Sequence, residues 1–154
     1  MIRVVNLYKS FHAQKVLNGV NIEFATGKIT TIVGTSGCGK TVLLKHLNAL
    51  LLPDKGEVFV DSVDITTLGQ RDLYQIRGKF GVLFQGAALL DSMTVFDNVA
   101  FPLREKTKMS ESAINKKVPE RLEQVGLGEM GHKFPAELSG GMKKRAGLAR
   151  ALIM

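Results

Sequence analysis

The sequence predicts an α/β fold with an N-terminal antiparallel β-subdomain, a parallel-sheet core and a helical subdomain. Three patterns predict it. A β-branched run at residues 28–33 suits a buried parallel strand, and a glycine-rich loop at residues 34–41 and helix formers at residues 41–52 follow it. Apolar and polar residues alternate over residues 20–24, which is typical of a half-buried antiparallel strand. Apolar residues recur at helical spacing in residues 110–125, which predicts an amphipathic helix.

Length and composition favour one domain with an anionic partner. A chain of 154 residues is long enough for a single core, and its 21 lysines and arginines against 14 acidic residues give a net charge of +7. This charge favours nucleotides, nucleic acids or an acidic membrane surface. No apolar run approaches the ~18 residues of a membrane span, no signal peptide is recognisable, and the single Cys38 cannot form an internal disulfide. We expect a soluble protein of a reducing, cytosolic compartment.

The chain is expected to open with short strands. Asn18-Gly19 is a turn signal, which places a separate strand at residues 20–24. Phe11 lies near the end of the first strand, where its ring either packs in the core, as most aromatic rings do, or stacks on a base. These strands form the small β-subdomain that precedes the glycine-rich loop.

The next elements alternate between strand and helix. A turn at residues 53–56 precedes a strand at residues 57–61. A helix at residues 69–77 and a buried strand at residues 80–84 follow. Gln85 ends that strand, and its amide either orients a metal or a water or is an ordinary residue at a strand end.

The helical subdomain is predicted after Gln85. Residues 91–103 begin as a loop and continue as a short helix. A longer helix starts at Ser110, and Pro119 should kink it or restart it near Val118, because proline lacks a backbone donor and clashes with the preceding turn. The alternative is a helix that begins at Pro119 itself.

The glycine-rich loop carries the first chemical signal, since it fits the phosphate-binding pattern G-x-x-x-x-G-K-[ST] at every fixed position. Its members are Gly34, Thr35, Ser36, Gly37, Cys38, Gly39, Lys40 and Thr41. The glycines let consecutive backbone N–H groups approach a phosphate, and the following helix points the positive end of its dipole at it. Lys40 would reach the β- and γ-phosphates, and the Thr41 hydroxyl would bind Mg²⁺. The motif therefore predicts a nucleoside triphosphate with Mg²⁺.

A second signal lies at Leu138–Met142, where Ser139 is a good N-cap and two glycines follow it. Lys143, Lys144 and Arg145 then add positive charge to the positive end of the helix dipole, which is locally unfavourable. Either an anion approaches this helix start, or the three side chains extend into water.

The phosphate loop, Gln85 and Leu138–Met142 occur in the order and spacing of an ATP-binding cassette (ABC) transporter ATPase, and the sequence resembles this family along its whole length. The resemblance implies a P-loop NTPase fold of ABC type. It also implies an ATP-binding core with the β-subdomain at about residues 1–85 and 139–154. The Q-loop and helical subdomain would occupy about residues 86–138.

The resemblance implies a role for each of these motifs. Phe11 becomes the adenine-stacking aromatic, and residues 34–41 become the Walker A loop. Lys40 and Gln85 are the implied catalytic residues, and Thr41 and Gln85 the implied metal ligands, with Gln85 also contacting the attacking water. The residues implied to contact ATP are Phe11, Gly34, Thr35, Ser36, Gly37, Cys38, Gly39, Lys40, Thr41, Gln85, Ser139, Gly140 and Gly141.

The partners follow from the same resemblance. Ser139, Gly140 and Gly141 match the signature motif, which in this family binds the γ-phosphate of ATP held by the opposite subunit. The implied unit is a head-to-tail dimer of two copies with two ATP molecules between them. Gln85 and residues 86–103 would link the nucleotide state to a transmembrane permease.

Two features resemble one branch of the family more than others. Residues 89–105 and Met142 look most like the ATPase of Mla/Mce-type phospholipid transporters. This implies phospholipid transport, a permease and an Mce-type lipid-binding protein as partners, and a place on the cytoplasmic face of the inner membrane. The alternative within the family is the ATPase of an amino-acid or other importer.

The sequence departs from the family pattern after the signature helix. The Walker B aspartate, the catalytic glutamate and the switch histidine would follow that helix, and they do not occur before Met154. His12, His46 and His132 all lie earlier, so none of them matches the switch histidine. We expect a truncated or partial gene product whose fold is incomplete at the C-terminus and which is inactive as an ATPase on its own.

Three other classes of protein were weighed. A DNA-repair or chromosome-maintenance ATPase would suit the positive charge, but it would carry a long coiled coil between Gln85 and Ser139, and residues 86–138 show no heptad run. We therefore expect no nucleic-acid partner. A non-catalytic fragment that binds nucleotide or the permease remains open. A small P-loop kinase ranks last, because it gives no reason for Leu-Ser-Gly-Gly.

Overall fold

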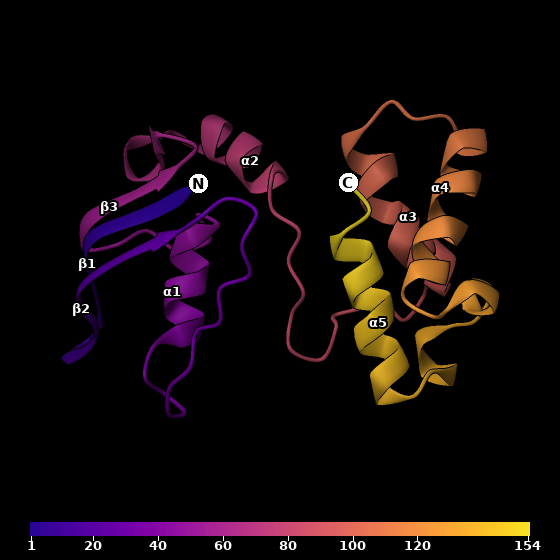
Figure 1. Ribbon diagram of the computed structural model, residues 1–154, viewed down its shortest axis with the longest axis horizontal. Helices are drawn as coiled ribbons and strands as arrows, with labels where there is room; N and C mark the ends of the chain where they lie inside the picture. Colours follow the sequence, from indigo (N-terminus) through magenta and orange to yellow (C-terminus); the bar gives the residue numbers. More distant parts are fainter. The chain divides into compact units, whose positions relative to one another are not determined.

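The computed structural model describes residues 1–154, which form two compact units. The N-terminal unit, Met1–Lys79, contains every strand, and the C-terminal unit, Phe80–Met154, is helical (Figure 1). No helix in either unit combines the length and the apolar character that crossing a membrane requires. The predicted grouping of residues 139–154 with an ATP-binding core stays a prediction.

The N-terminal unit is built on a four-stranded antiparallel sheet in the order β2-β1-β3-β4. The strands are β1 (Ile2–Phe11), β2 (Gln14–Phe24), β3 (Lys55–Val60) and β4 (Val63–Asp64). Val4 pairs with Ile22 on one side and with Val58 on the other, and Val4 and Val58 are almost fully buried. The predicted antiparallel β-subdomain is confirmed, and so is the strand alternation over residues 20–24, whose exposure alternates along β2.

The predicted turn at Asn18-Gly19 is wrong, because β2 runs straight through both residues and the hairpin turns at His12-Ala13 instead. Gly19 has a φ of +70°, and a Cβ there would lie 2.9 Å from the Tyr8 hydroxyl. The register between β1 and β2 shifts next to this point, after Leu7. The glycine therefore serves a bulge within a strand rather than a turn between strands.

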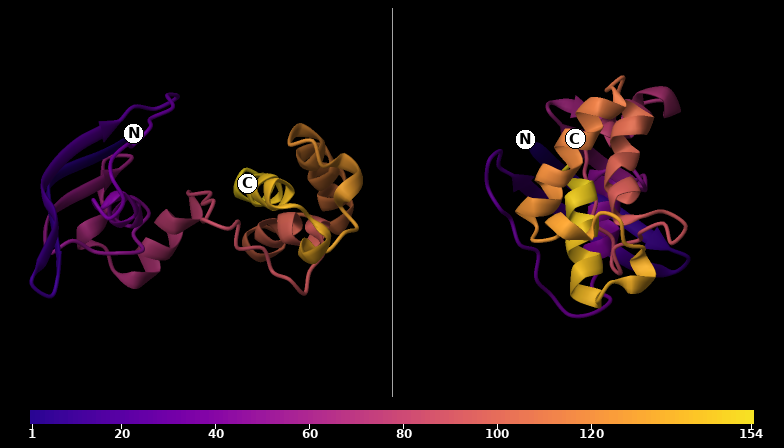
Figure 2. Two further views of the ribbon diagram at one scale, coloured as in Figure 1. Left: turned by 90° about the horizontal axis from the view of Figure 1, so that it is seen from below. Right: turned by 90° about the vertical axis from the view of Figure 1, so that its right-hand side faces the viewer.

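Two helices complete the N-terminal unit. Helix α1 (Lys40–Leu47) begins at the glycine-rich loop and packs beside β2 and β3, which Figure 2 shows from a second direction. It buries Leu43, His46 and Leu47. Helix α2 (Gln70–Gly78) follows the short 3₁₀ helix η1 (Ile65–Thr67). Both helices confirm the predicted positions, although α1 ends earlier than the helix formers in the sequence.

The C-terminal unit is a bundle of three helices (Figures 1 and 2). They are α3 (Val95–Lys106), α4 (Glu111–Gln124) and α5 (Gly140–Ala151), with the 3₁₀ helices η2 (Gly128–Met130) and η3 (Pro135–Glu137) between the last two. Its core consists of fully buried apolar side chains, among them Val95, Val99, Leu103, Ile114, Val118, Leu122, Leu127, Ala146, Ala149 and Ile153. Ser110 starts α4 as predicted, since its Oγ accepts a hydrogen bond from the Ala113 N–H at 3.3 Å.

The predicted restart near Val118 is wrong, because α4 continues as one helix through Pro119. Pro119 and Asn115, whose carbonyl loses the usual donor from position 119, both lie on the exposed face of the helix. Water can satisfy that carbonyl, so the proline costs one hydrogen bond without ending the helix.

Two predicted buried strands are not formed, the parallel one at residues 28–33 and the one at residues 80–84. Residues 28–33 and residues 80–84 have no regular structure. Ile29 is fully exposed, and the Phe84 side chain is 50% exposed. A strand requires a neighbour that satisfies its backbone groups, and neither run pairs with another strand in its own unit. The sheet that is formed is the antiparallel one alone.

Candidate functional site

The glycine-rich loop is shaped by two residues with left-handed backbone. Gly37 has a φ of +80° and Gly39 a φ of +98°, conformations that favour glycine. Gly39 is the N-cap of α1, and its carbonyl accepts a hydrogen bond from the Leu43 N–H at 2.8 Å. The loop therefore leads directly into the first turn of a helix, where unpaired N–H groups and the helix dipole favour an anion.

Lys40 folds back along the loop that precedes it. Its Nζ donates to the carbonyl oxygen of Gly34 at 2.8 Å and to that of Thr35 at 2.7 Å, and it lies 3.7 Å from Cys38 Sγ. Residues 34–38 are exposed, and the first turn of α1 contains no acidic residue. The loop thus presents an ammonium group and a helix start on one exposed surface, which is an arrangement that attracts phosphate.

Thr41 lies exposed in the first turn of α1, next to Lys40. Its hydroxyl supplies an oxygen atom, the ligand type that Mg²⁺ prefers. Gln85, the other predicted metal ligand, lies in the C-terminal unit, and its joining with Thr41 in one metal site stays a prediction. No cluster of three or more His, Cys, Asp or Glu side chains suited to a metal occurs in the structure. The donors present therefore fit a cation whose remaining ligands are phosphate oxygens and water.

Phe11 is the last residue of β1, and its side chain is 42% exposed. Lys9 lies on the same strand with its Nζ 5.8 Å from the centre of the Phe11 ring. The ring is therefore outside the buried core of the N-terminal unit. Its stacking on a base stays a prediction.

Gln85 lies in the C-terminal unit at the start of a turn over residues 85–88 and is exposed. The turn continues with Gly86, Ala87 and Ala88, all with positive φ. Arg150 donates to the carbonyl oxygens of Ala87 and Ala88 at 2.7 and 2.8 Å. Burial lowers the pKa of Arg150.

The signature stretch forms the start of α5, as its N-cap predicted. The Oγ of Ser139 accepts a hydrogen bond from the Met142 N–H at 3.3 Å, and the Ser139 carbonyl accepts one from the Lys143 N–H at 2.9 Å. Gly140 and Gly141 are exposed, and nothing lies within 4 Å of a Cβ built on either of them. This helix start is open to a ligand or to another chain.

The predicted site residues fall into two groups. The N-terminal unit contains Phe11 and residues 34–41, and the C-terminal unit contains Gln85 and residues 139–141. Within each unit they are positioned by local structure: a strand end, a loop that opens a helix, a turn and a helix N-cap. The joining of the two groups in one site stays a prediction.

Sequence reasoning missed two polar side chains that hold the segment after Gln85. One is Arg150, and the other is Asn98, which is fully buried in α3. Asn98 accepts a hydrogen bond from the Leu90 N–H and donates to the carbonyl oxygens of Leu90, Met93 and Thr94 at 2.9 to 3.1 Å. The segment after Gln85 is therefore fixed to α3 by a side chain that no sequence pattern singled out.

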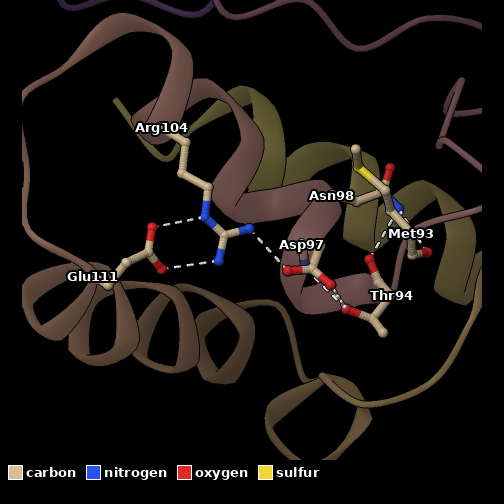
Figure 3. Close-up of polar contacts among 6 residues, drawn as sticks. All are labelled: Met93, Thr94, Asp97, Asn98, Arg104 and Glu111. Carbon is tan, nitrogen blue, oxygen red and sulfur yellow. Dashed lines mark hydrogen bonds and ion pairs between the residues drawn. The ribbon is translucent and has the colours of Figure 1, made fainter.

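Figure 3 shows the polar contacts around this segment. The Oγ1 of Thr94 caps α3 by accepting from the Asp97 N–H at 3.1 Å, and it donates to Asp97 Oδ2 at 2.6 Å. The Thr94 hydroxyl and then Arg104 hold the pKa of Asp97 below its usual range. Thr94 and Asp97 follow the spacing of a capping pair, a signal that the sequence did contain.

Comparison with known proteins gives the context of this site. The model of the family described as ABC transporter matches residues 17–154. A solved dimeric ATP-binding cassette, in a post-hydrolysis state with ADP and Pi, superposes with a TM-score of 0.92 at 32% identity and covers 99% of this chain and 69% of that one. The match confirms the predicted P-loop NTPase fold of ABC type, with its antiparallel N-terminal sheet and its helices.

Three curated relatives align with nearly the whole chain. A probable ribonucleotide transport ATP-binding protein of Mycobacterium leprae is 49% identical over 99% of this chain. An intermembrane phospholipid transport system ATP-binding protein, MlaF, of Haemophilus influenzae is 44% identical over 100% of it. A methionine import ATP-binding protein, MetN, of Carboxydothermus hydrogenoformans is 46% identical over 99%. The chain spans 44%, 58% and 46% of the lengths of these relatives, respectively.

Proposed function

The chain belongs to the ABC transporter family, and from this premise we propose that it is the ATP-binding subunit of a transporter that couples ATP binding and hydrolysis to transport. The observation that carries the proposal is the position of Lys40. Its ammonium group hydrogen-bonds two carbonyls of its own loop and lies beside the start of α1. A β- or γ-phosphate that enters the loop would be met by a cation and by backbone N–H groups.

We assign the remaining ATP contacts to the residues that the family pattern names. The exposed ring of Phe11 would stack on adenine, and Thr41 and Gln85 would hold Mg²⁺. The metal would neutralise phosphate charge when it is bound with ATP. Gln85 would orient the attacking water, while Lys40 would stabilise the charge that develops on the phosphates.

We propose that the working unit is a head-to-tail dimer. Ser139, Gly140 and Gly141 would approach the γ-phosphate of ATP held by a second copy. The open start of α5, with no atom near either glycine and three basic residues in the following turn, supports this assignment. The related cassette that carries ADP and Pi is dimeric, which also supports it.

Phospholipid is the substrate class that we propose. The relative from Haemophilus influenzae is named for intermembrane phospholipid transport, and the resemblance of residues 89–105 to Mla/Mce-type ATPases points the same way. The partners would be a transmembrane permease and an Mce-type lipid-binding protein, with the chain held at the cytoplasmic face of the inner membrane through the permease. A methionine importer is the second candidate, because the relative named MetN is 46% identical.

The experiment that tests the ATP site is calorimetric titration with Mg-ATP. We expect Lys40→Ala to weaken ATP binding at least about tenfold, since hydrogen bonds to charged groups contribute about 1.5–3 kcal/mol. Lys45→Ala is the matched control, because Lys45 is an exposed lysine on the same helix and should bind ATP as the unchanged protein does. Equal affinities for the two variants would refute the assignment of Lys40.

The substrate is tested on the complex of this chain with its permease. Lipid extraction followed by mass spectrometry should find phospholipid retained by the complex, and Mg-ATP should reduce the amount retained. A complex that instead binds methionine in equilibrium dialysis, without retained phospholipid, would favour the second candidate.

A further inference from the structure

The turn that carries Gln85 has a backbone that its own sequence does not favour. Gly86, Ala87 and Ala88 have φ values of +83°, +69° and +48°. Glycine adopts this region freely, but alanine adopts it only at an energetic cost. Two consecutive alanines in the left-handed region therefore require contacts from outside the turn.

Arg150 supplies those contacts from the last turn of α5. Its Nη2 donates to the carbonyl oxygen of Ala87 at 2.7 Å, and its Nη1 donates to that of Ala88 at 2.8 Å. The planar guanidinium presents two parallel donors, which match two successive carbonyls that point the same way. One side chain thus fixes both residues whose backbone is unfavourable.

Residues 81–87 pack closely against the C-terminal half of α5. A Cβ on Gly147 would lie 3.0 Å from the Cβ of Ala87. A Cβ on Gly81 would collide with the carbonyl oxygen of Ala151. Ala87 itself is fully buried. The approach to Gln85 therefore rests on the C-terminal half of α5 with no room for a larger side chain at either glycine.

We propose that Arg150 is a positioning residue for Gln85, because it fixes the 85–88 turn to α5. The same helix begins with Ser139 as its N-cap, and its 12 residues span ~18 Å at ~1.5 Å per residue. The turn of Gln85 is then attached to the C-terminal end of α5, and Ser139 lies at the N-terminal end of the same helix. A displacement of Gln85 would therefore displace Ser139 with it. The functional meaning of this link rests on the proposed function, which assigns Gln85 to the ATP site.

Hydrogen exchange of the whole chain tests the link. We compare the unchanged protein with Arg150→Gln, with Arg150→Lys and with the control Arg121→Gln, whose guanidinium donates only to Gln124 of its own helix. The amide of Ala87, which donates to the Phe84 carbonyl at 2.9 Å, should exchange about tenfold faster in Arg150→Gln, because two charge-assisted hydrogen bonds are lost. Arg150→Lys should restore part of the protection, and Arg121→Gln should leave it unchanged.

If Arg150→Gln also speeds exchange in α4, the helical bundle itself has loosened. The exchange at Ala87 in Arg150→Lys, measured with α4 still protected, is then the test of the proposal. Unchanged exchange at Ala87 in Arg150→Gln, with the bundle intact, would overturn the proposal. So would an Arg150→Lys variant that keeps α4 protected but exchanges at Ala87 as fast as Arg150→Gln does, since an ammonium group can also donate to two carbonyl oxygens, as Lys40 does to those of Gly34 and Thr35.

Adding Mg-ATP separates this inference from the proposed function. In the unchanged protein we expect exchange to slow in the 34–41 loop and to change in the first turn of α5. At protein concentrations where light scattering shows only the monomer, no second copy contacts Ser139 directly, and Arg150→Gln should keep the response of the loop and lose that of α5. No response of the loop in the unchanged protein would refute ATP binding, while the exchange at Ala87 would still judge Arg150. A response of α5 that survives Arg150→Gln would refute the link between Gln85 and Ser139.

Discussion

Arg104 and Glu111 are joined by two parallel hydrogen bonds, from Nε to Oε1 at 2.9 Å and from Nη2 to Oε2 at 3.0 Å. The same guanidinium donates through Nη1 to Asp97 Oδ1 at 2.9 Å, so one cation connects both ends of α3 with the start of α4 (Figure 3). Arg104 is the first cause of the lowered pKa of Glu111, and it is the second cause, after Thr94, of the lowered pKa of Asp97.

These lowered values predict a pH dependence that Arg104→Met should reduce. A carboxyl group with a folded-state pKa below its unfolded value of about 4 contributes full stability above that value and loses it as the pH falls through the folded-state pKa. We therefore expect the urea midpoint of the unchanged protein to fall more between about pH 5 and pH 3 than that of Arg104→Met. Arg121→Met, which loses a contact to an amide, should keep the original pH dependence. Equal slopes for Arg104→Met and the unchanged protein would contradict the prediction.

Asn98 should tolerate neither a smaller nor a charged replacement. Asn98→Ala removes four hydrogen bonds in a fully buried place and leaves backbone groups unpaired, which we expect to lower the free energy of unfolding by about 1–3 kcal/mol. Asn98→Asp should cost more, because it loses the same donors and also buries a charged carboxylate beside carbonyl oxygens. Urea unfolding measures both. Variants as stable as the unchanged protein would show that the hydrogen bonds of Asn98 are unimportant, and an aspartate variant as stable as the alanine variant would contradict the expected order.

The two left-handed glycines of the phosphate loop should respond differently to alanine. Gly37→Ala meets no atom within 4 Å, so its cost is backbone strain alone, about 1–2 kcal/mol. Gly39→Ala adds contacts of 3.1 Å with Val16 and Leu17 and should lower the free energy of unfolding further. Urea unfolding of the two variants gives the comparison, and a Gly39→Ala variant no less stable than Gly37→Ala would be the contrary result.

Ser139 and Thr94 are both N-caps, which allows their structural and functional roles to be separated. Ser139→Ala and Thr94→Ala should each cost about 1 kcal/mol of stability. Only Ser139→Ala should also weaken dimer formation with Mg-ATP, as measured by light scattering. Equal dimerisation of the two variants would mean that the Ser139 hydroxyl serves its helix alone.

Local signals in the sequence predicted the helix starts well. Ser110 and Ser139 act through an N–H three residues further on, so a short window of sequence contains both partners. The predictions of buried strands at residues 28–33 and 80–84 were wrong for the opposite reason. An apolar run indicates only that the segment is able to form a strand. Its formation depends on a neighbouring strand that no local pattern supplies.

The candidate site divides in the same way. The phosphate loop is contiguous, so its motif located Lys40 and the start of α1 from sequence alone. The contacts of Asn98 and Arg150 could not be predicted from the sequence. Both side chains bind backbone carbonyl oxygens, which every residue possesses, so no partner residue type marks them. A positive charge is also favourable in the last turn of any helix. The sequence position of Arg150 is therefore explained without its contact with the turn that carries Gln85.

A Cβ on Gly147 would lie 2.8 Å from Leu83 Cδ1 and 3.0 Å from Ala87 Cβ, so a methyl group at position 147 requires Leu83 to move and competes with the methyl group of Ala87. Because Ala87 and Gly147 come from segments far apart in the chain, the limit applies to their combined volume rather than to either position. Gly147→Ala alone should lower the free energy of unfolding. In the double variant with Ala87→Gly, one methyl group is removed from position 87 and one is added at position 147. The glycine would also relieve the left-handed backbone at position 87. Across related sequences, these two positions should therefore covary, with a small residue at one wherever the other gains a methyl group.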